Sequence, residues 1–459
     1  MNLHEDAKFT EIPDYAFTNN SLTTITIPKN VKRIGKAFRS NALTEINLNE
    51  GLEVIDGSFV NARITSIDLP DSLLVIGREA FWCCTKLEYI EFPENLTEIG
   101  FYAFNRAGLK EIIFSENITY ISRGAFVKCP LKKIVMPESV ASIVDETFWD
   151  CAELEIVVIG GKVEEIGSVA FANCTSLETV VIPDSVTSIS EDAFMDSNED
   201  MVIYCNEGSY AETYAIQNNI KYTTLVLDSV PNQTYTGKAI EPQVKAKANN
   251  RPLTLNTEYK LSYSDNINVG VANIVARGLG DFKHLVAKGK FNILACQLKS
   301  IDVKYEDFTY YSPNGIKIDL VLYLGNDLLT EGEDYEIIGL DKIKGVGTYN
   351  IAVKGKDNIS GTKNLTLDVL PRSITETKVS SKDGIKVTDS QYTLVDGVDY
   401  RVEKRTNQSG DLETYVVGVG NYTDEKRVSS TGDSFETNIL YRILALFEKI
   451  FEAIRNVFK

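Results

Sequence analysis

The chain has 459 residues, of which 43% are hydrophobic, and it carries a formal net charge of −18 at pH 7. Its length predicts about three domains of ordinary size, and its apolar content is sufficient for large buried cores. The negative charge disfavours nucleic acids and anionic membranes as partners, because both would repel the chain.

Side chains that carry out catalysis or bind metals are scarce. The two histidines, His4 and His284, cannot form a paired-His zinc site or a His-based nucleophile system. The seven cysteines lack CxxC spacing, and no calcium-binding D-x-D-x-D-G loop occurs. We therefore predict no catalytic residue, no metal and no cofactor.

The start of the chain shows no targeting signal. Residues 1–6 are polar, and no run of 18 uncharged apolar residues follows anywhere in the sequence. Residues 9–13 already correspond to the second half of the repeat described next. A solenoid that begins there exposes its core, so we expect a shortened or processed product.

One phenylalanine recurs every 21–23 residues, which predicts one small structural unit copied nine times. The recurring residues are Phe17, Phe38, Phe59, Phe81, Phe104, Phe126, Phe148, Phe171 and Phe194. Each unit carries an L-x-x-I-x-I-P segment with the period of a half-buried strand, and proline ends that strand. Since no unit buries its own apolar face, we predict a solenoid with a parallel sheet and an internal phenylalanine ladder.

Four cysteines follow the recurring phenylalanine by three residues: Cys84, Cys129, Cys151 and Cys174. This common position predicts a small buried ladder. After the last unit, Tyr210 and Tyr214 have the spacing of one helical face. A short helix there and a strand near 221–222 are expected to cap the solenoid, which we assign to residues 1–225.

These repeats resemble the BspA-like leucine-rich repeat family of bacterial surface proteins. The resemblance covers roughly residues 9–225 and rests on nine units that keep the phenylalanine, strand and isoleucine positions together. It implies a secreted or cell-surface protein. It further implies an adhesin that binds host matrix proteins or other microbes.

The second half predicts three all-β sandwich modules, at 226–295, 296–370 and, in degenerate form, 371–433. Short alternating runs are separated by Gly, Asn and Pro, and the fragments around Asp334-Tyr335 and Asp399-Tyr400 recur. They resemble bacterial immunoglobulin-like stalk domains. Either they act as spacers or they form a second binding region.

Residues 434–459 predict an amphipathic helix, because apolar residues recur there at helical spacing. Three roles remain open for it. The helix can pack on the last module, pair with another copy of the chain in a homo-oligomer, or lie on a membrane surface.

The residues between the apolar positions of each solenoid strand are expected to face solvent. They are polar in the first units, and an apolar column replaces them later. The predicted binding surface comprises Tyr89, Glu111, Ile113, Lys133, Val135, Ile156, Val158, Thr179 and Val181. An exposed apolar strip marks a protein interaction surface, although β-branched residues also suit a flat parallel sheet.

Three function classes follow from this organisation. The first is a non-enzymatic, protein-binding surface protein on a stalk, and the second is an architectural or self-assembling cell-surface protein. The third, a glycan-binding or glycan-degrading protein, is disfavoured because the acidic residues are scattered over repeat surfaces and do not converge as a glycosidase requires.

Overall fold

The computed structural model describes residues 8–381 and 384–428, which form two compact units. The first unit contains residues 8–231, 241–265 and 272–291, and the second contains 232–240, 266–271 and the described residues from 292 onward. The chain is mainly β, as predicted. The predicted helix at 434–459 lies outside the described residues, so its three possible roles remain predictions.

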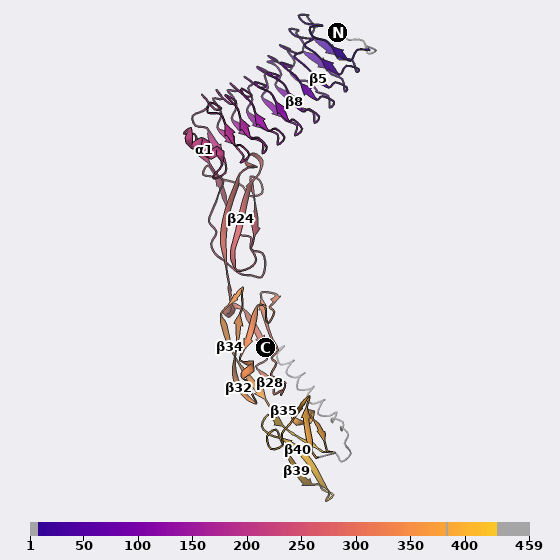
Figure 1. Cartoon of the computed structure of the whole chain (residues 1–459), viewed down its shortest axis with the longest axis vertical. Helices are drawn as coiled ribbons and strands as arrows, with labels where there is room; N and C mark the ends of the chain where they lie inside the picture. Colours follow the sequence, from indigo (N-terminus) through magenta and orange to yellow (C-terminus); the bar gives the residue numbers. More distant parts are fainter. Residues whose placement is uncertain (1–7, 382–383, 429–459) are drawn as a thin grey trace, which may run out of the picture. The chain divides into compact units, whose positions relative to one another are not determined.

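The N-terminal repeats form a solenoid in which each repeat is one coil (Figure 1). One side of the coils carries three-residue strands: β2 (Thr24–Thr26), β4 (Glu45–Asn47), β7 (Tyr89–Glu91), β9 (Glu111–Ile113), β11 (Lys133–Val135), β13 (Ile156–Val158), β15 (Thr179–Val181) and β17 (Val202–Tyr204). The pairs β2–β4, β7–β9, β11–β13, β13–β15 and β15–β17 are all parallel, and β11, β13, β15 and β17 belong to one sheet. The parallel sheet of the prediction is therefore confirmed.

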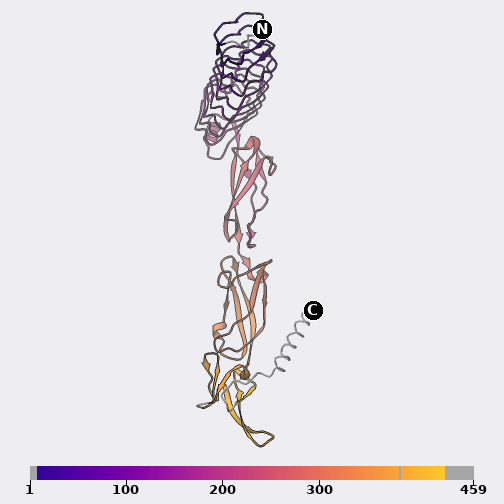
Figure 2. The same cartoon turned by 90° about the vertical axis from the view of Figure 1, so that its right-hand side faces the viewer.

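A second side of the coils carries two-residue strands: β1 (Glu11–Ile12), β3 (Arg33–Ile34), β5 (Val54–Ile55), β6 (Val75–Ile76), β8 (Glu98–Ile99), β10 (Tyr120–Ile121), β12 (Ser142–Ile143), β14 (Glu165–Ile166) and β16 (Ser188–Ile189). The strands β1 to β10 of this set form a six-stranded parallel sheet, and β12, β14 and β16 form a three-stranded one. Figure 2 shows the coils stacked on one another.

The nine phenylalanines form the interior ladder that the period predicts. Successive ring centroids lie 5.2–6.0 Å apart, and every pair except Phe59–Phe81 is stacked with nearly parallel rings. From Phe38 to Phe171 the rings are almost completely buried. Each coil thus supplies one ring, and the next coil covers it.

The cysteine position has a hydrogen-bonding reason. Each ladder thiol donates to the carbonyl of the phenylalanine in the preceding coil, over 3.0 Å from Cys84, 3.1 Å from Cys129, 3.2 Å from Cys151 and 3.4 Å from Cys174. In the same position Asn41 and Ser197 make the equivalent bond through Nδ2 and Oγ. A small donor is favoured here because an unpaired buried carbonyl is costly.

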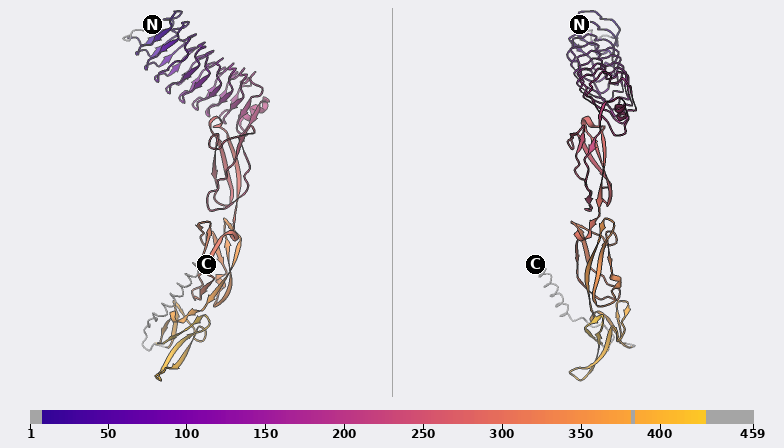
Figure 3. Two further views of the ribbon diagram at one scale, coloured as in Figure 1. Left: turned by 180° about the vertical axis from the view of Figure 1, so that it is seen from behind. Right: turned by 90° about the vertical axis from the view of Figure 1, so that its left-hand side faces the viewer.

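Helix α1 (Tyr210–Gln217) and β18 (Lys221–Thr223) close the last coil, as the sequence predicts (Figure 3). Ser209 caps the helix through its side chain, and β18 extends the sheet by pairing in parallel with β17. The Tyr214 ring lies 6.2 Å from Phe194 and covers the end of the ladder. Tyr210 is largely exposed instead.

The rest of the chain consists of mainly antiparallel sheets with a recurring order. Residues 226–294 contain β19 (Val226–Leu227), β20 (Gln233–Thr234), β21 (Ala246–Ala248), β22 (Arg251–Pro252), β23 (Tyr259–Ser264), β24 (Gly270–Gly278), η1 (Gly280–Phe282) and β25 (Val286–Leu294). They form the sheets β19-β21-β22 and β20-β25-β24-β23. We call this part the first module.

The second module repeats this order with β26 (Cys296–Gln297), η2 (Leu298–Ser300), β27 (Asp302–Tyr305), β28 (Phe308–Tyr310), β29 (Leu320–Leu324), β30 (Asp327–Leu328), β31 (Tyr335–Ile338), η3 (Leu340–Lys342), β32 (Gly347–Gly355), β33 (Ile359–Ser360) and β34 (Thr362–Leu370). Its sheets β27-β29-β30 and β28-β34-β32-β31 match those of the first module strand for strand. Residues of both sheets share one core.

The third module contains β35 (Arg372–Ser373), η4 (Ile374–Glu376), β36 (Lys378–Ser380), β37 (Lys386–Asp389), β38 (Tyr392–Thr393), β39 (Tyr400–Thr406), β40 (Leu412–Gly418), β41 (Tyr422–Thr423) and β42 (Glu425–Arg427). Its main sheets are β36-β37-β38 and β39-β40-β42. The module boundaries of the prediction and its immunoglobulin-like assignment remain predictions.

The recurring sequence fragments of the modules have a common physical cause. The hydroxyls of Tyr259, Tyr335 and Tyr400 each donate to a backbone carbonyl 15 residues earlier in the chain. At Gly278, Gly355 and Gly418 an added Cβ would lie 1.8–2.6 Å from backbone oxygen, so no side chain fits. One tyrosine and one glycine therefore fix the same turn and core contact three times.

A recurring joint follows each of these glycines. In the second module the residue three positions later is Asn358, whose Oδ1 accepts a 2.8 Å hydrogen bond from the backbone N–H of Val269. In the third module it is Asn421, whose Oδ1 accepts a 2.8 Å hydrogen bond from the backbone N–H of Val346. Tyr311 adds a ring contact to this arrangement, 5.8 Å from Tyr422. The joint thus combines a polar loop with an aromatic side chain of the preceding module.

We expect Phe126→Ala to lower the free energy of unfolding of the first compact unit by about 3–5 kcal/mol, because it removes a ring stacked on both sides. Urea unfolding followed by circular dichroism measures the loss. Phe308→Ala is the control, since Phe308 is 39% exposed and belongs to the second unit. An equal loss in both variants would contradict the ladder's role.

Candidate binding surfaces

The predicted outward column is exposed in the middle of the solenoid. Tyr89 is 40% exposed, Ile113 52% and Val135 42%, while their strand neighbours Ile112 and Ile134 are buried. Glu111 is exposed too and lies directly opposite Tyr89 in the β7–β9 register. We call Tyr89, Ile113 and Val135 the exposed strip, which Glu111 borders.

The prediction that Val158 and Val181 face solvent is wrong, because both side chains are completely buried. They belong to a cluster with Tyr204 of the solenoid, which also contains these residues of the first module and its connection: Leu225, Ala246, Ala248, Leu253, Tyr259, Ala276, Leu285 and Ala287. The apolar column therefore continues under the first module. Val158 and Val181, at the C-terminal end of this column, thus pack the solenoid against the first module within the first compact unit.

Three other predicted site residues lie at the edge of this contact. Ile156 and Thr179 are half-buried, and Ile156 packs against the same cluster. Lys133 is exposed, but its Nζ lies 2.6 Å from Asp281 Oδ1 of η1. These residues thus border the covered part of the sheet, and Lys133 carries an ion-pair partner within the chain.

A polar seam that the sequence did not reveal continues from Lys133. The Glu138 carboxylate pairs with Lys283, lies 3.4 Å from His284 Nε2 and accepts a 2.6 Å hydrogen bond from the Gly161 backbone N–H. Asn206 adds two bonds, donating to the His284 carbonyl over 3.0 Å and accepting from the Val286 N–H over 2.7 Å. The solenoid residues of this seam bind residues of the first module far along the chain, so no local sequence pattern predicts these contacts.

The surroundings of the seam shift the pKa of two of its groups. Burial lowers the pKa of His284 below its ordinary value of 6.5, and the Glu138 charge offsets this only in part. Burial raises the pKa of Glu138, but hydrogen bonds from Lys283 and Gly161 and the nearby positive charges outweigh it, so the net shift is downward. A neutral imidazole beside a carboxylate is thus the favoured state near pH 7.

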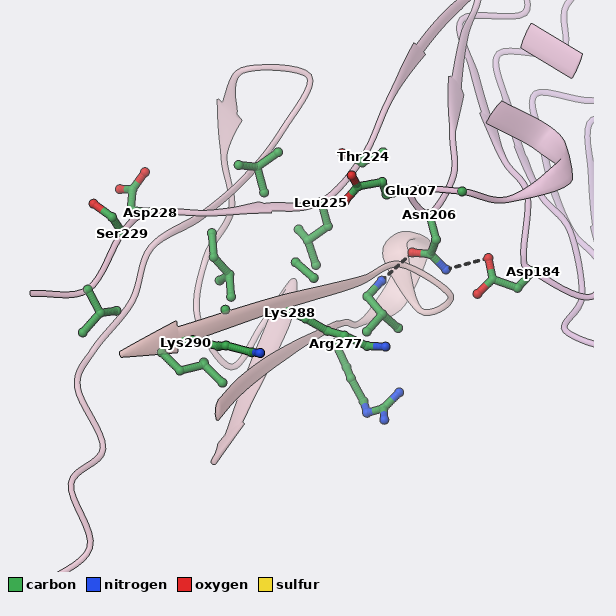
Figure 4. A pocket seen from close by; sticks show the side chains of 18 residues that line it. Asp184, Asn206, Glu207, Thr224, Leu225, Asp228, Ser229, Arg277, Lys288 and Lys290 are labelled. Atoms are coloured by element: carbon green, nitrogen blue, oxygen red, sulfur yellow. Dashed lines mark hydrogen bonds between the residues drawn. The ribbon is translucent and has the colours of Figure 1, made fainter. Parts of the chain in front are cut away.

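A groove of about 740 Å³ lies next to the seam, between β25, the chain around 224–230 and the end of the solenoid. Three basic residues, Arg277, Lys288 and Lys290, line it (Figure 4). Asp184, Glu207 and Asp228 are its acidic residues. Asp184 accepts a 3.1 Å hydrogen bond from Asn206, and Asp228 pairs with Lys247.

Within residues 8–381 and 384–428, no group of three His, Cys, Asp or Glu side chains is arranged to hold a metal ion. The ladder thiols are not poised for nucleophilic chemistry, since burial raises the pKa of Cys84 and Cys174 to about 12. None of the helices in this part of the chain has the length and hydrophobicity needed to cross a membrane.

Comparison with known proteins identifies the repeats. The BspA type leucine rich repeat region matches the chain in six copies, over residues 10–130 and 98–224. No curated protein matches the chain.

Several solved structures of bacterial proteins are similar over part of the chain. A leucine rich cell surface protein from Faecalibacterium prausnitzii shares 25% identity over 46% of this chain and 66% of its own, with a TM-score of 0.33. The pneumococcal vaccine antigen PcpA shares 17% over 48% and 72%, with a TM-score of 0.28. A leucine-rich repeat protein from Bacteroides ovatus shares 17% over 48% and 90%, with a TM-score of 0.22. The match thus spans just under two thirds of the Faecalibacterium chain.

Val135 and Val158 are directly opposite each other in the β11–β13 register but differ in exposure, which provides a matched pair. We expect Val158→Asp to lower the free energy of unfolding of the first compact unit by about 3 kcal/mol or more, because it buries an unpaired carboxylate. Val135→Asp should change it by no more than about 0.5 kcal/mol. Urea unfolding compares the two variants, and equal effects would show that the first module does not cover Val158.

The first compact unit should become less stable as the pH falls below about 6.5. The folded pKa of His284 is lowered, so the unfolded chain binds the proton first, and stability falls from the unfolded pKa down to the folded one. His284→Gln should reduce the difference in unfolding free energy between pH 7.5 and 5.5. An unchanged difference would show that His284 does not titrate with unfolding; staying above pH 5 limits the contribution of Glu138.

Proposed function

We propose that this chain, whose residues 10–224 match the BspA type leucine rich repeat region, is a non-enzymatic protein of the bacterial cell surface that binds another protein through its solenoid. The observation that carries the proposal is the exposed strip. Tyr89, Ile113 and Val135 present apolar surface on strands of successive coils, whereas the equivalent Val158 and Val181 are covered. Apolar residues that stay uncovered on a repeat sheet are typical of interaction surfaces.

The charges beside the exposed strip indicate the chemistry of the partner. Glu91 and Glu111 lie on the same face as Tyr89 and Ile113, and Glu45 and Asp68 follow on the earlier coils. An apolar centre with an acidic rim fits a partner surface that has an apolar patch flanked by Lys or Arg. We propose a host matrix protein or a protein of another microbe's surface, with the three modules acting as a spacer.

Rigid support makes the exposed strip suitable for recognition. Its side chains project from strands whose inward residues, Ile90, Ile112 and Ile134, are buried in the solenoid core. The backbone is thus fixed before the partner arrives, and binding orders only the outward side chains. Tyr89 combines apolar area with a hydroxyl, which suits the centre of a protein interface.

The test is a binding screen of the whole chain against extracellular matrix proteins and microbial surface proteins. For a protein that binds, the triple variant Tyr89→Ala, Ile113→Thr, Val135→Thr should raise Kd by about tenfold or more, which corresponds to about 1.4 kcal/mol. The control variant Val395→Thr, Val398→Thr, Leu412→Thr changes residues of the third module that are 55–65% exposed. It should bind as the unmodified chain does.

Two results would contradict the proposal. Equal binding by the triple variant and the unmodified chain would move the site away from the exposed strip. Binding of the chain only to its own copies, detected by light scattering and abolished in the triple variant, would favour a self-assembling architectural protein.

A further inference from the structure

The first module differs in charge from the rest of the chain. Residues 226–295 contain nine Lys and Arg and five Asp and Glu, a net charge of +4, whereas the whole chain carries −18. The remaining residues therefore carry −22. A local excess of positive charge in a strongly acidic protein calls for a structural explanation.

Four of the basic residues gather on one sheet face. The inward side chains of β24 and β25, such as Ile274, Ala276 and Ala287, are buried, so alternation turns Arg277, Lys288 and Lys290 outward, where they are exposed. Lys260 of β23 lies directly opposite Arg277 in the β23–β24 register. We call Lys260, Arg277, Lys288 and Lys290 the cationic face.

No ion pair or side-chain hydrogen bond engages the four cations among the residues that the structure describes. Other cations of the module do have acidic partners: Lys247 pairs with Asp228, Arg251 with Glu258 and Lys283 with Glu138. Lys247, Arg251 and Lys283 are thus held by ion pairs, whereas the four cations of the sheet face are available to a ligand. Unpaired cations at neighbouring positions repel one another, so an anionic ligand would stabilise them.

The groove beside this face is lined by side chains of both charges. Figure 4 shows Arg277, Lys288 and Lys290 along two neighbouring strands that border the groove. Of its three acidic residues, Asp184 is hydrogen-bonded to Asn206 and Asp228 is paired with Lys247. The three carboxylates formally balance the three cations of the groove, so the excess of positive charge lies on the sheet face itself, where Lys260 adds a fourth cation.

We infer that the cationic face binds an anionic polysaccharide, a polymer whose sulfate or phosphate groups recur along a sugar or polyol chain. Arg277 suits two oxygens of one such group, and lysines provide mobile point charges for the next. The other outward side chains include Ser262 and Asn273, which can exchange hydrogen bonds with hydroxyl groups. This ligand and this site are separate from the exposed strip and its protein partner.

The composition of the face favours a polysaccharide over other polyanions. Proteins that bind single-stranded nucleic acid stack bases on aromatic side chains, and the outward positions of β23, β24 and β25 carry no aromatic residue. Insertion into a lipid bilayer requires a continuous apolar surface, whereas the exposed apolar residues of these strands, Val271 and Leu294, lie at the strand ends away from Arg277 and Lys288. A row of cations along neighbouring strands matches an extended, hydrated, anionic chain.

The experiment measures Kd of the whole chain for dextran sulfate, a glycerol-phosphate polymer, uncharged dextran and a DNA duplex, at 50 and 300 mM NaCl. We expect binding to at least one of the two anionic polymers, weaker at the higher salt concentration, and no binding to dextran. The variant Arg277→Gln, Lys288→Gln, Lys290→Gln should raise Kd at least tenfold. The control Lys299→Gln, Lys317→Gln, Lys404→Gln removes the same charge from exposed positions of the other modules and should bind normally.

The polymers also separate the two sources of the ligand. Binding to dextran sulfate alone identifies a sulfated glycan, and binding to the glycerol-phosphate polymer alone identifies a wall-type polymer. The inference is overturned if neither polymer binds at 50 mM NaCl, if both variants lose affinity equally, or if dextran or DNA binds as tightly as the better anionic polymer. Urea unfolding of each variant checks that the fold is unchanged.

Discussion

Stacking of one phenylalanine ring on the next is the interaction on which the solenoid depends. With ring centroids 5.2–6.0 Å apart, each coil has to repeat the same backbone path, and that path fixes which side chains point inward. The interior accepts only apolar groups and small donors such as the thiol of Cys151, which satisfies the Phe126 carbonyl. Recognition is therefore left to the outward residues.

The repeat was predictable because its signals are local. The phenylalanine period, the strand alternation and the capping helix at Tyr210–Gln217 all lie within stretches of about 25 residues, and the structure contains them. The burial of Val158 and Val181 under the first module was not predictable, because Ala246, Leu285 and their neighbours, which cover them, lie 65–130 residues further along the chain. Alternation shows that a residue points away from its own core but not whether another core lies beyond it.

The two surfaces developed from this structure have opposite chemical character. The exposed strip is apolar with Glu91 and Glu111 at its side, whereas the face around Arg277 and Lys288 is cationic. The seam where solenoid and module meet contains ion pairs of its own, Lys133 with Asp281 and Glu138 with Lys283.

The joint between modules has an evolutionary consequence. Asn358 and Asn421 accept the same backbone hydrogen bond from the preceding module, and at the equivalent position Asp281 pairs with Lys133 of the solenoid. A duplicated module brings both halves of this joint with it, so an added copy needs no newly evolved interface. The number of modules is then free to vary by gene duplication, while only the first copy has to keep the aspartate that fits the repeats.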